Sequence, residues 1–194
     1  MTRPVRTLGN SFRTRTLLKV VAFWAVFWLA LVGLRSVSIP GLGGGSATVA
    51  AGILIVVIVV LVAGLLRIEG GRAREIGLGF RPACLVQFLA GTGLGVAVVA
   101  FMILALWLFT PLEIEASVDS NVPAVLAISF VILFVLALME ELAFRSYPLF
   151  RLREALGLRP AIYITSIAFA AYHGLAFENL LGPGVWGLFY GWMA

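Results

Sequence analysis

The sequence predicts an all-α fold, a polytopic bundle of transmembrane helices that forms a single membrane domain over residues 1–194. Of the 194 residues, 62% are hydrophobic and 12% are charged, whereas roughly 25% of the residues in an average soluble domain are charged. The mean hydropathy is +1.09. The apolar residues form runs of about 20, the length of a helix that crosses a hydrocarbon core about 30 Å thick. We therefore expect the chain to lie in a lipid bilayer.

Five full spans and the start of a sixth are expected. A basic tail over residues 1–16 precedes the first span, at about 17–38. Its apolar run is at the long end for a signal peptide and has no small-residue cleavage site beside it, so we expect this helix to be retained. Further spans are expected at about 47–66, 83–110, 124–146 and 160–181, with a partial span at 185–194.

Two of these segments need a further argument. The run at 47–66 is rich in Val and Ile, which favour strands, but its length favours a helix. Glycine and proline at 182–184 indicate a turn, after which only ten residues follow. Ten residues of helix cover roughly 15 Å, about half of the hydrocarbon core. We therefore expect this chain to be a fragment of a longer protein, or its last segment to be re-entrant or interfacial.

The charged residues indicate which loops face the cytoplasm. The formal net charge is +5, which in a soluble protein would raise the question of nucleic-acid binding. Here the basic residues lie before the first span, between the second and third, and after the fourth, whereas the loop at 111–123 is acidic. Basic segments beside apolar runs are typical of cytoplasmic membrane loops. This pattern predicts a cytoplasmic N-terminus and no nucleic-acid partner.

Two adjacent carboxylates and an arginine stand at the end of the fourth apolar run, at Glu140, Glu141 and Arg145. Ionisable groups in a bilayer are costly and are functional by default. Glu141 and Arg145 lie four residues apart, so both face one side of a helix and can pair. Glu140 then has no local partner, and a desolvated carboxyl group suits a general base or acid. In an alternative interpretation, neither glutamate has a chemical role, and both only form ion pairs with Arg145, Arg151 or Arg153.

His173 is the only histidine of the chain and lies in the middle of the predicted fifth span. It reaches the depth of Glu140 if the fourth span continues through a kink at Pro148 to about Arg153. The Glu140 and His173 side chains would then share a cavity open to cytoplasmic water. A lone histidine can also serve only as an interhelical hydrogen-bonding group, and both interpretations stay open on the residues alone.

Two motifs in this region resemble those of a known family. Glu140 and Glu141 with Arg145, followed later by Phe169 and, four residues on, His173, resemble the first and second motifs of the CPBP family (CAAX protease and bacteriocin-processing, also called Abi). These intramembrane proteases include the CAAX prenyl endopeptidases and bacterial relatives linked to bacteriocin immunity.

The resemblance is sharp over about residues 135–192 and looser over the earlier spans. Tyr147 and Leu149 also stand where the family tends to have them. The resemblance implies a hydrolase, an intramembrane endopeptidase of the bacterial plasma membrane that acts near the cytoplasmic face. Its partners would be a peptide or protein substrate and the lipid bilayer.

The same resemblance implies a role for each candidate residue. Glu140 would activate the attacking water, Glu141 and Arg145 would orient the site, and His173 would polarise the tetrahedral intermediate or donate a proton to it. The family's third motif, a histidine with an asparagine four residues on, has no match in this sequence. The resemblance therefore implies a truncation before that motif. Losing an oxyanion donor costs about 10²–10³ in rate, so the chain as given is expected to be nearly inactive.

The cofactor stays open at this point. With a single histidine, the chain can form no two-histidine zinc site. A divalent metal held by Glu140, Glu141 and His173 is geometrically feasible but has no further support in the sequence. The enzyme would be a metalloprotease in the one case and a glutamate-dependent endopeptidase without metal in the other.

A second class of function also stays open, a non-catalytic membrane protein such as an immunity or partner-binding factor. In that class the glutamates would have only a structural role. A proton-coupled transporter is less favoured, because the sequence has no repeated halves with broken helices.

Overall fold

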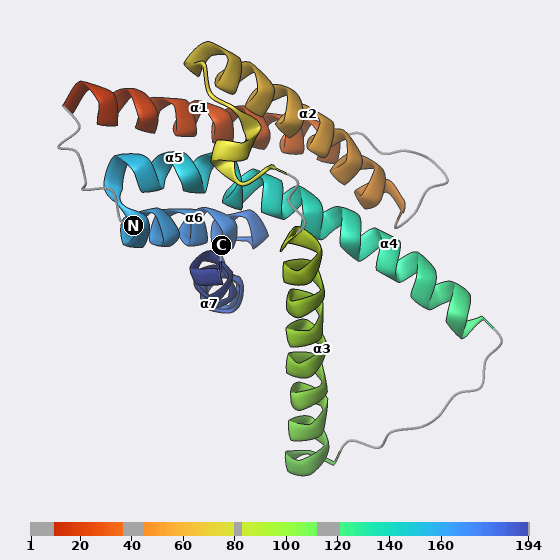
Figure 1. The fold of residues 1–194 in the computed structure, drawn as a ribbon. Helices are drawn as coiled ribbons and strands as arrows, with labels where there is room; N and C mark the ends of the chain where they lie inside the picture. The colour runs from red at the N-terminus through yellow and green to blue at the C-terminus, as the bar shows by residue number, and fades with distance from the viewer. Residues whose placement is uncertain (1–9, 37–44, 80–82, 112–120, 194) are drawn as a thin grey trace. The chain divides into compact units, whose positions relative to one another are not determined.

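The computed structural model of the chain describes residues 10–36, 45–79, 83–111 and 121–193. These residues form helices and no strand, as the sequence predicts (Figure 1). In chain order the elements are α1 (Asn10–Arg35), α2 (Gly45–Glu69), η1 (Ala73–Ile76), α3 (Ala83–Phe109), α4 (Val122–Glu140), η2 (Glu141–Arg145), α5 (Tyr147–Leu156), α6 (Leu158–His173) and α7 (Phe177–Met193).

Among the residues that the structure describes, four helical stretches are long and apolar enough to cross a membrane. They are Asn10–Leu34, Ser46–Glu69, Ala83–Phe109 and Val122–Leu156. The first three coincide with predicted spans apart from their ends. The fourth exceeds its predicted range of 124–146, because the helix resumes after Ser146 and continues as α5. Residues 1–9 of the predicted basic tail (1–16) lie outside the described residues, as do the predicted loop segments at 37–44 and 112–120. Residues 10–16 of that tail belong to α1.

The predicted fifth and sixth spans are wrong in their boundaries. The helix expected over 160–181 ends at His173, where Gly174 has φ 134°, a backbone conformation that glycine adopts readily. The turn expected at 182–184 lies inside α7, which begins at Phe177 and contains Pro183. Apolar surroundings favour continuous helix, and membrane helices tolerate an internal proline, so the Gly-Pro-Gly pattern does not break this one. The last segment is therefore part of a helix of 17 residues.

The chain divides into two compact units by its internal contacts. The smaller unit covers residues 79–127 and consists of α3 and the first turns of α4. No described side chain of α3 is buried, and a helix that is apolar all round is typical of a lipid environment. The larger unit covers residues 1–78 and 128–194 and contains every residue of the predicted site.

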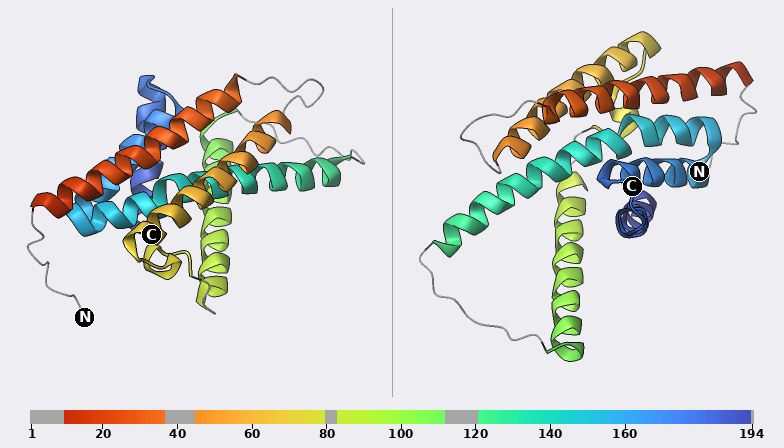
Figure 2. Two further views of the ribbon diagram at one scale, coloured as in Figure 1. Left: turned by 90° about the horizontal axis from the view of Figure 1, so that it is seen from above. Right: turned by 180° about the vertical axis from the view of Figure 1, so that it is seen from behind.

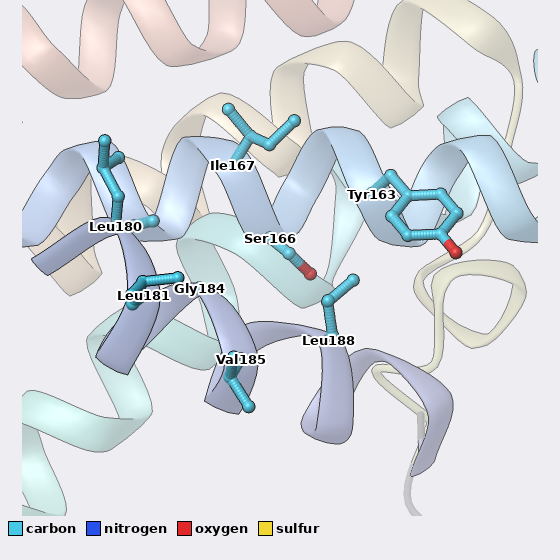
Figure 3. A pocket seen from close by; sticks show the side chains of 9 residues that line it. Tyr163, Ser166, Ile167, Leu180, Leu181, Gly184, Val185 and Leu188 are labelled. Atoms are coloured by element: carbon cyan, nitrogen blue, oxygen red, sulfur yellow. The ribbon is translucent and has the colours of Figure 1, made fainter. Parts of the chain in front are cut away.

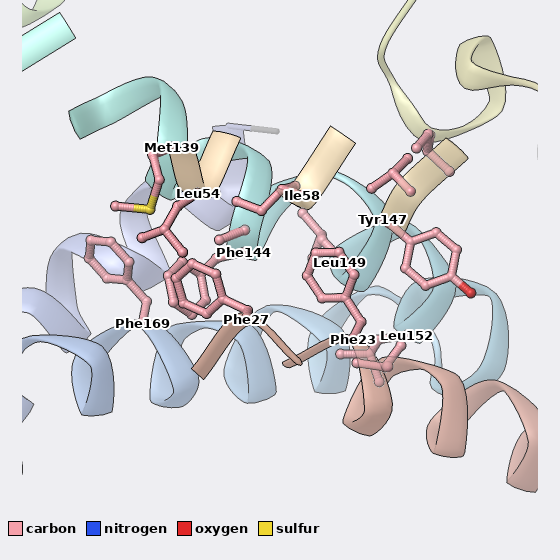
Figure 4. Packing of buried hydrophobic residues seen from close by; sticks show 14 of the residues in the cluster. Phe23, Phe27, Leu54, Ile58, Met139, Phe144, Tyr147, Leu149, Leu152 and Phe169 are labelled. Carbon is pink, nitrogen blue, oxygen red and sulfur yellow. The ribbon is translucent and has the colours of Figure 1, made fainter. Parts of the chain in front are cut away.

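The core of the larger unit is built on one apolar stripe from each of α1 and α2, which lie side by side (Figure 2). Residues three or four apart form each stripe. The stripes consist of Val20, Phe23, Phe27 and Leu31 on α1 and Ala51, Leu54, Ile58, Val62 and Leu66 on α2. The Phe27 ring meets that of Phe144 edge to face at 5.8 Å, and the Phe23 ring lies 5.9 Å from that of Tyr147 (Figure 4). These contacts hold η2 and the start of α5 against α1.

Glu69, the last residue of α2, joins three helices through its carboxylate. It accepts hydrogen bonds from Lys19 Nζ on α1 at 2.9 Å, from the Tyr147 hydroxyl at 2.8 Å and from Arg151 Nη2 at 2.6 Å. Tyr147 and Arg151 lie one turn apart on α5 and so face the same carboxylate. The side chains of Glu69 and Arg151 are only 13% and 12% exposed. This charge cluster fixes the end of α2 against α1 and α5.

The cluster corrects one alternative drawn from the sequence. Arg151 was considered there as a partner of Glu140 or Glu141. In the structure it pairs with Glu69 and, at 2.7 Å, with Glu154. No sequence pattern indicates this arrangement, because Glu69 and Arg151 are 82 residues apart and come together only in the folded helix packing.

We predict that Glu69→Gln destabilises the protein by about 2 kcal/mol. Removing one partner of a fully buried ion pair costs roughly 3–5 kcal/mol, and here Arg151 keeps Glu154 as a second partner. The free energy of unfolding can be measured by denaturation in mixed micelles. Glu154→Gln is the matched control: its side chain is 45% exposed, so the loss should stay below about 1 kcal/mol. Equal losses for the two variants would contradict the role given to Glu69.

Candidate active site

The site forms where the long helix of residues 122–156 is interrupted. After Glu140 the α-helix widens into the π-helical turn η2, and Ser146 N–H donates to the carbonyl of Glu141, five residues back, at 3.1 Å. Ser146 then leaves helical geometry, with ψ −116°, and Pro148 stands in the first turn of α5. Wide turns of this kind are frequent at functional sites. The turn contains Glu141 and Arg145 and follows Glu140 directly.

Trp24 of α1 provides a hydrogen bond that the interrupted helix lacks. In the π-helical register the carbonyl of Ala143 would accept from the N–H of residue 148, but proline has none. Trp24 Nε1 donates to this carbonyl at 3.1 Å instead. An unpaired carbonyl in apolar surroundings is costly, so Trp24 stabilises the break. A buried indole N–H usually finds an acceptor, but nothing in the sequence identified which one.

Glu140 and His173 meet across the gap between the end of α4 and the end of α6. Glu140 Oε1 lies 3.7 Å from His173 Nε2, and their side chains are 23% and 32% exposed. This distance is too long for a direct hydrogen bond. The two groups are therefore close enough to contact one water or one substrate atom together, and both remain partly accessible.

The hydrogen bond made by the other ring nitrogen, Nδ1, defines which tautomer the neutral His173 ring adopts. Nδ1 lies 3.0 Å from the carbonyl oxygen of Phe169. A carbonyl oxygen only accepts, so Nδ1 carries the hydrogen. In the neutral ring, Nε2 then presents a lone pair toward Glu140, and in the imidazolium it presents a proton. The Phe169 ring also contacts the imidazole edge to face at 4.6 Å, which restricts its orientation.

Glu141 and Arg145 form the ion pair that their spacing allows, with Arg145 Nη1 donating to Glu141 Oε1. The pair is unequal in exposure: the Glu141 side chain is 52% exposed and that of Arg145 is 7% exposed. The guanidinium carbon of Arg145 lies 5.0 Å from the centre of the Phe169 ring. Phe169 therefore contacts both Arg145 and His173, and it links the two charged pairs of the site.

An apolar groove of about 270 Å³ runs along α6 beside α7 and begins one turn before His173 (Figure 3). Its lining residues are Tyr163, Ser166, Ile167, Ala170, Leu180, Leu181, Gly184, Val185 and Leu188. Apart from Tyr163 and Ser166, the side chains that line the groove are aliphatic. The groove therefore suits apolar groups.

The part of the chain that the structure describes contains no group of three or more His, Cys, Asp or Glu side chains able to hold a metal ion. Glu140 and His173 approach each other, but Glu141 points its carboxylate to Arg145. The described donor set therefore does not fit the Glu140, Glu141 and His173 metal site considered from the sequence.

These observations define a helical membrane protein in which charged side chains meet at the break of one long helix. Residues 122–194 match the family model described as type II CAAX prenyl endopeptidase Rce1-like. The matched segment runs from α4 to the end of the chain and contains all four candidate residues. This match confirms the predicted resemblance to CPBP intramembrane proteases and supports a protease as the general class. No curated protein and no solved structure matches the chain significantly.

We predict that Trp24→Phe destabilises the protein by about 1–3 kcal/mol, the cost of leaving a buried carbonyl without a donor. The variant keeps an aromatic ring against Phe144 but loses the bond to Ala143. Unfolding in mixed micelles measures the loss. Trp28→Phe serves as the control, because Trp28 lies one turn after Trp24 on α1 and makes ring contacts with Phe27 and Tyr172. If both variants lose the same stability, the hydrogen bond does not stabilise the break.

Proposed function

We propose that this protein is an intramembrane endopeptidase in which Glu140 activates water for attack on a peptide bond. The observation that carries the proposal is the approach of Glu140 and His173, at 3.7 Å, from two helices that pack around a helix break. A carboxylate and an imidazole at this separation can contact the same water molecule. The match of residues 122–194 to a protease family supports the same chemistry.

Glu140 is the general base of the proposed reaction. Its carboxylate accepts a proton from the water while the water oxygen forms a bond to the carbonyl carbon of the substrate. The proton then passes from Glu140 to the leaving nitrogen as the carbon–nitrogen bond breaks. The partial exposure of Glu140 gives water access to the carboxylate, and the protein around it keeps the group in place.

His173 acts on the oxygen of the tetrahedral intermediate. When Nε2 carries a proton, it donates to the developing oxyanion and stabilises it. The bond from Nδ1 to the Phe169 carbonyl keeps Nε2 directed toward Glu140 in either state. The imidazole therefore keeps the same orientation whether or not Nε2 carries a proton.

Glu141 and Arg145 orient the site from the other side of the helix break. Their ion pair fixes the wide turn that follows Glu140, and so limits the movement of the Glu140 backbone. The buried guanidinium also places a positive charge beside the carboxylate of Glu141. Both residues act by position and charge, and neither exchanges a proton in the proposed steps.

The proposed substrate is a peptide or protein segment that reaches the site from the membrane. The apolar groove along α6, whose lining includes Ala170 one turn before His173, offers space for aliphatic side chains. The distribution of basic segments supports a site near the cytoplasmic face, with the N-terminus on that side. The observations favour an apolar peptide as the substrate.

We predict that Glu140→Gln and His173→Gln each lower peptide cleavage by about 10²–10⁴, the usual contribution of a general acid or base. The complete gene product would be reconstituted in liposomes with a library of apolar peptides, and the products identified by mass spectrometry. Glu178→Gln is the control, since Glu178 is an exposed carboxylate in the first turn of α7. It should leave the rate unchanged.

Two outcomes would argue against the proposal. Unchanged cleavage in Glu140→Gln would remove Glu140 from the reaction. If no peptide is cleaved, but a biological protection or binding activity persists in both folded variants, the non-catalytic alternative would be the better assignment.

A further inference from the structure

A tyrosine from α7 covers the arginine of the site. The guanidinium carbon of Arg145 lies 5.1 Å from the centre of the Tyr190 ring and 5.0 Å from that of Phe169. The two rings come from different helices, α7 and α6, and together they leave Arg145 8% exposed. A cation between two aromatic faces is attracted by both rings. Neither the charge pattern nor the motifs of the sequence pointed to Tyr190.

Two glycines allow α7 to come close enough for this contact. A Cβ atom at Gly187 would lie 3.2 Å from the Ser166 backbone Cα, and one at Gly191 would lie 2.9 Å from Ile162 Cγ2. Small residues permit such close approach of helices in membranes. Gly187 and Gly191 flank Tyr190 along α7, so the closest part of the helix contact is also the part that presents this ring.

The Tyr190 ring is held in turn by a second aromatic residue. Trp186, four residues earlier on α7, stacks on it with a centroid distance of 5.8 Å and an interplanar angle of 26°. The ring of Tyr190 is thus fixed by its own helix and contacts Arg145. This arrangement gives α7 a defined contribution to the charged site, although none of the candidate residues lies on α7.

We propose that Tyr190 is a positioning residue that acts through Arg145. Together with Phe169 it holds the guanidinium against Glu141, which keeps Glu140 free to face His173. Without the Tyr190 ring, the Arg145 guanidinium loses one of its two aromatic contacts. It can then turn from Glu141 toward Glu140, where it competes with His173 for the Glu140 carboxylate. The proposal deepens the proposed function and rests on it for the catalytic consequence, whereas the enclosure of Arg145 can be tested without any activity.

The first test measures the accessibility of Arg145 to phenylglyoxal by mass spectrometry in the full chain in micelles. Tyr190→Leu should increase the modification rate of Arg145 about fivefold, the change expected for one lost cation–π contact. Tyr190→Phe keeps the ring and should react like the wild type. Trp192→Leu is the control, because Trp192 lies two residues further on α7 and is 58% exposed. Equal modification of Arg145 in Tyr190→Leu and wild type would overturn the proposal.

The second test separates positioning from a general structural effect. In the complete gene product, Tyr190→Leu should lower kcat about tenfold with KM unchanged within about twofold, as expected when a transition-state interaction is lost, and Tyr190→Phe should restore kcat. A rise in KM alone, or an equal loss in Tyr190→Phe, would overturn the positioning role. If Tyr190→Leu does not fold, Tyr190→Met replaces it in both tests.

The two proposals can fail separately. A wild-type protein that cleaves no peptide counts against the proposed function, whereas the phenylglyoxal experiment still decides whether Tyr190 encloses Arg145. Cleavage that depends on Glu140, combined with an Arg145 that is equally accessible with and without the Tyr190 ring, would retain the protease and reject the role of Tyr190.

Discussion

The interruption of the helix over residues 122–156 is the constraint on which the other features depend. A proline in an apolar helix leaves backbone groups without partners, and in a bilayer these cannot turn to water. The wide turn η2 shifts the hydrogen-bond register, and the Trp24 indole supplies the missing donor. Because the break is stabilised from α1, it can carry charged side chains without fraying. The packing of Phe23 on Tyr147, at the start of α5, and of Phe27 on Phe144, in η2, serves the same purpose.

Phe169 and Glu69 stabilise the site in different ways. Phe169 contacts the site directly through its ring and its carbonyl, and so couples the orientation of His173 to the place of Arg145. Glu69 is remote and anchors α5 through Tyr147 and Arg151. One residue thus controls the geometry of the reacting groups, and the other controls the helix that follows the break. A substitution of Phe169 should therefore lower the reaction rate, whereas a substitution of Glu69 should lower the stability of the protein.

The sequence was sufficient for the features that depend on local pattern. Run length and composition predicted helices, and the i,i+4 spacing of Glu141 and Arg145 predicted their contact, because both are set within one or two turns. Long-range pairings such as Glu69 with Arg151 could not be derived, since they depend on helix packing. The end of α6 was missed for another reason: the Gly-Pro-Gly segment is a strong breaker in water, whereas the isolated Gly174 is a weak signal by pattern and becomes a break through its φ angle.

Gly174 has a mechanical consequence for the site. It separates His173, the last residue of α6, from α7, so the direction in which α7 leaves the histidine depends on the torsions of a very short connection. Tyr190 lies thirteen residues beyond the start of α7, roughly 20 Å along the helix. A rotation of about 5° at the connection would displace its ring by roughly 2 Å over that length. A small change in the Gly174 torsions would therefore move Tyr190 by a much larger distance. The close helix contact at Gly187 and Gly191 holds α7 against α6 and opposes this movement.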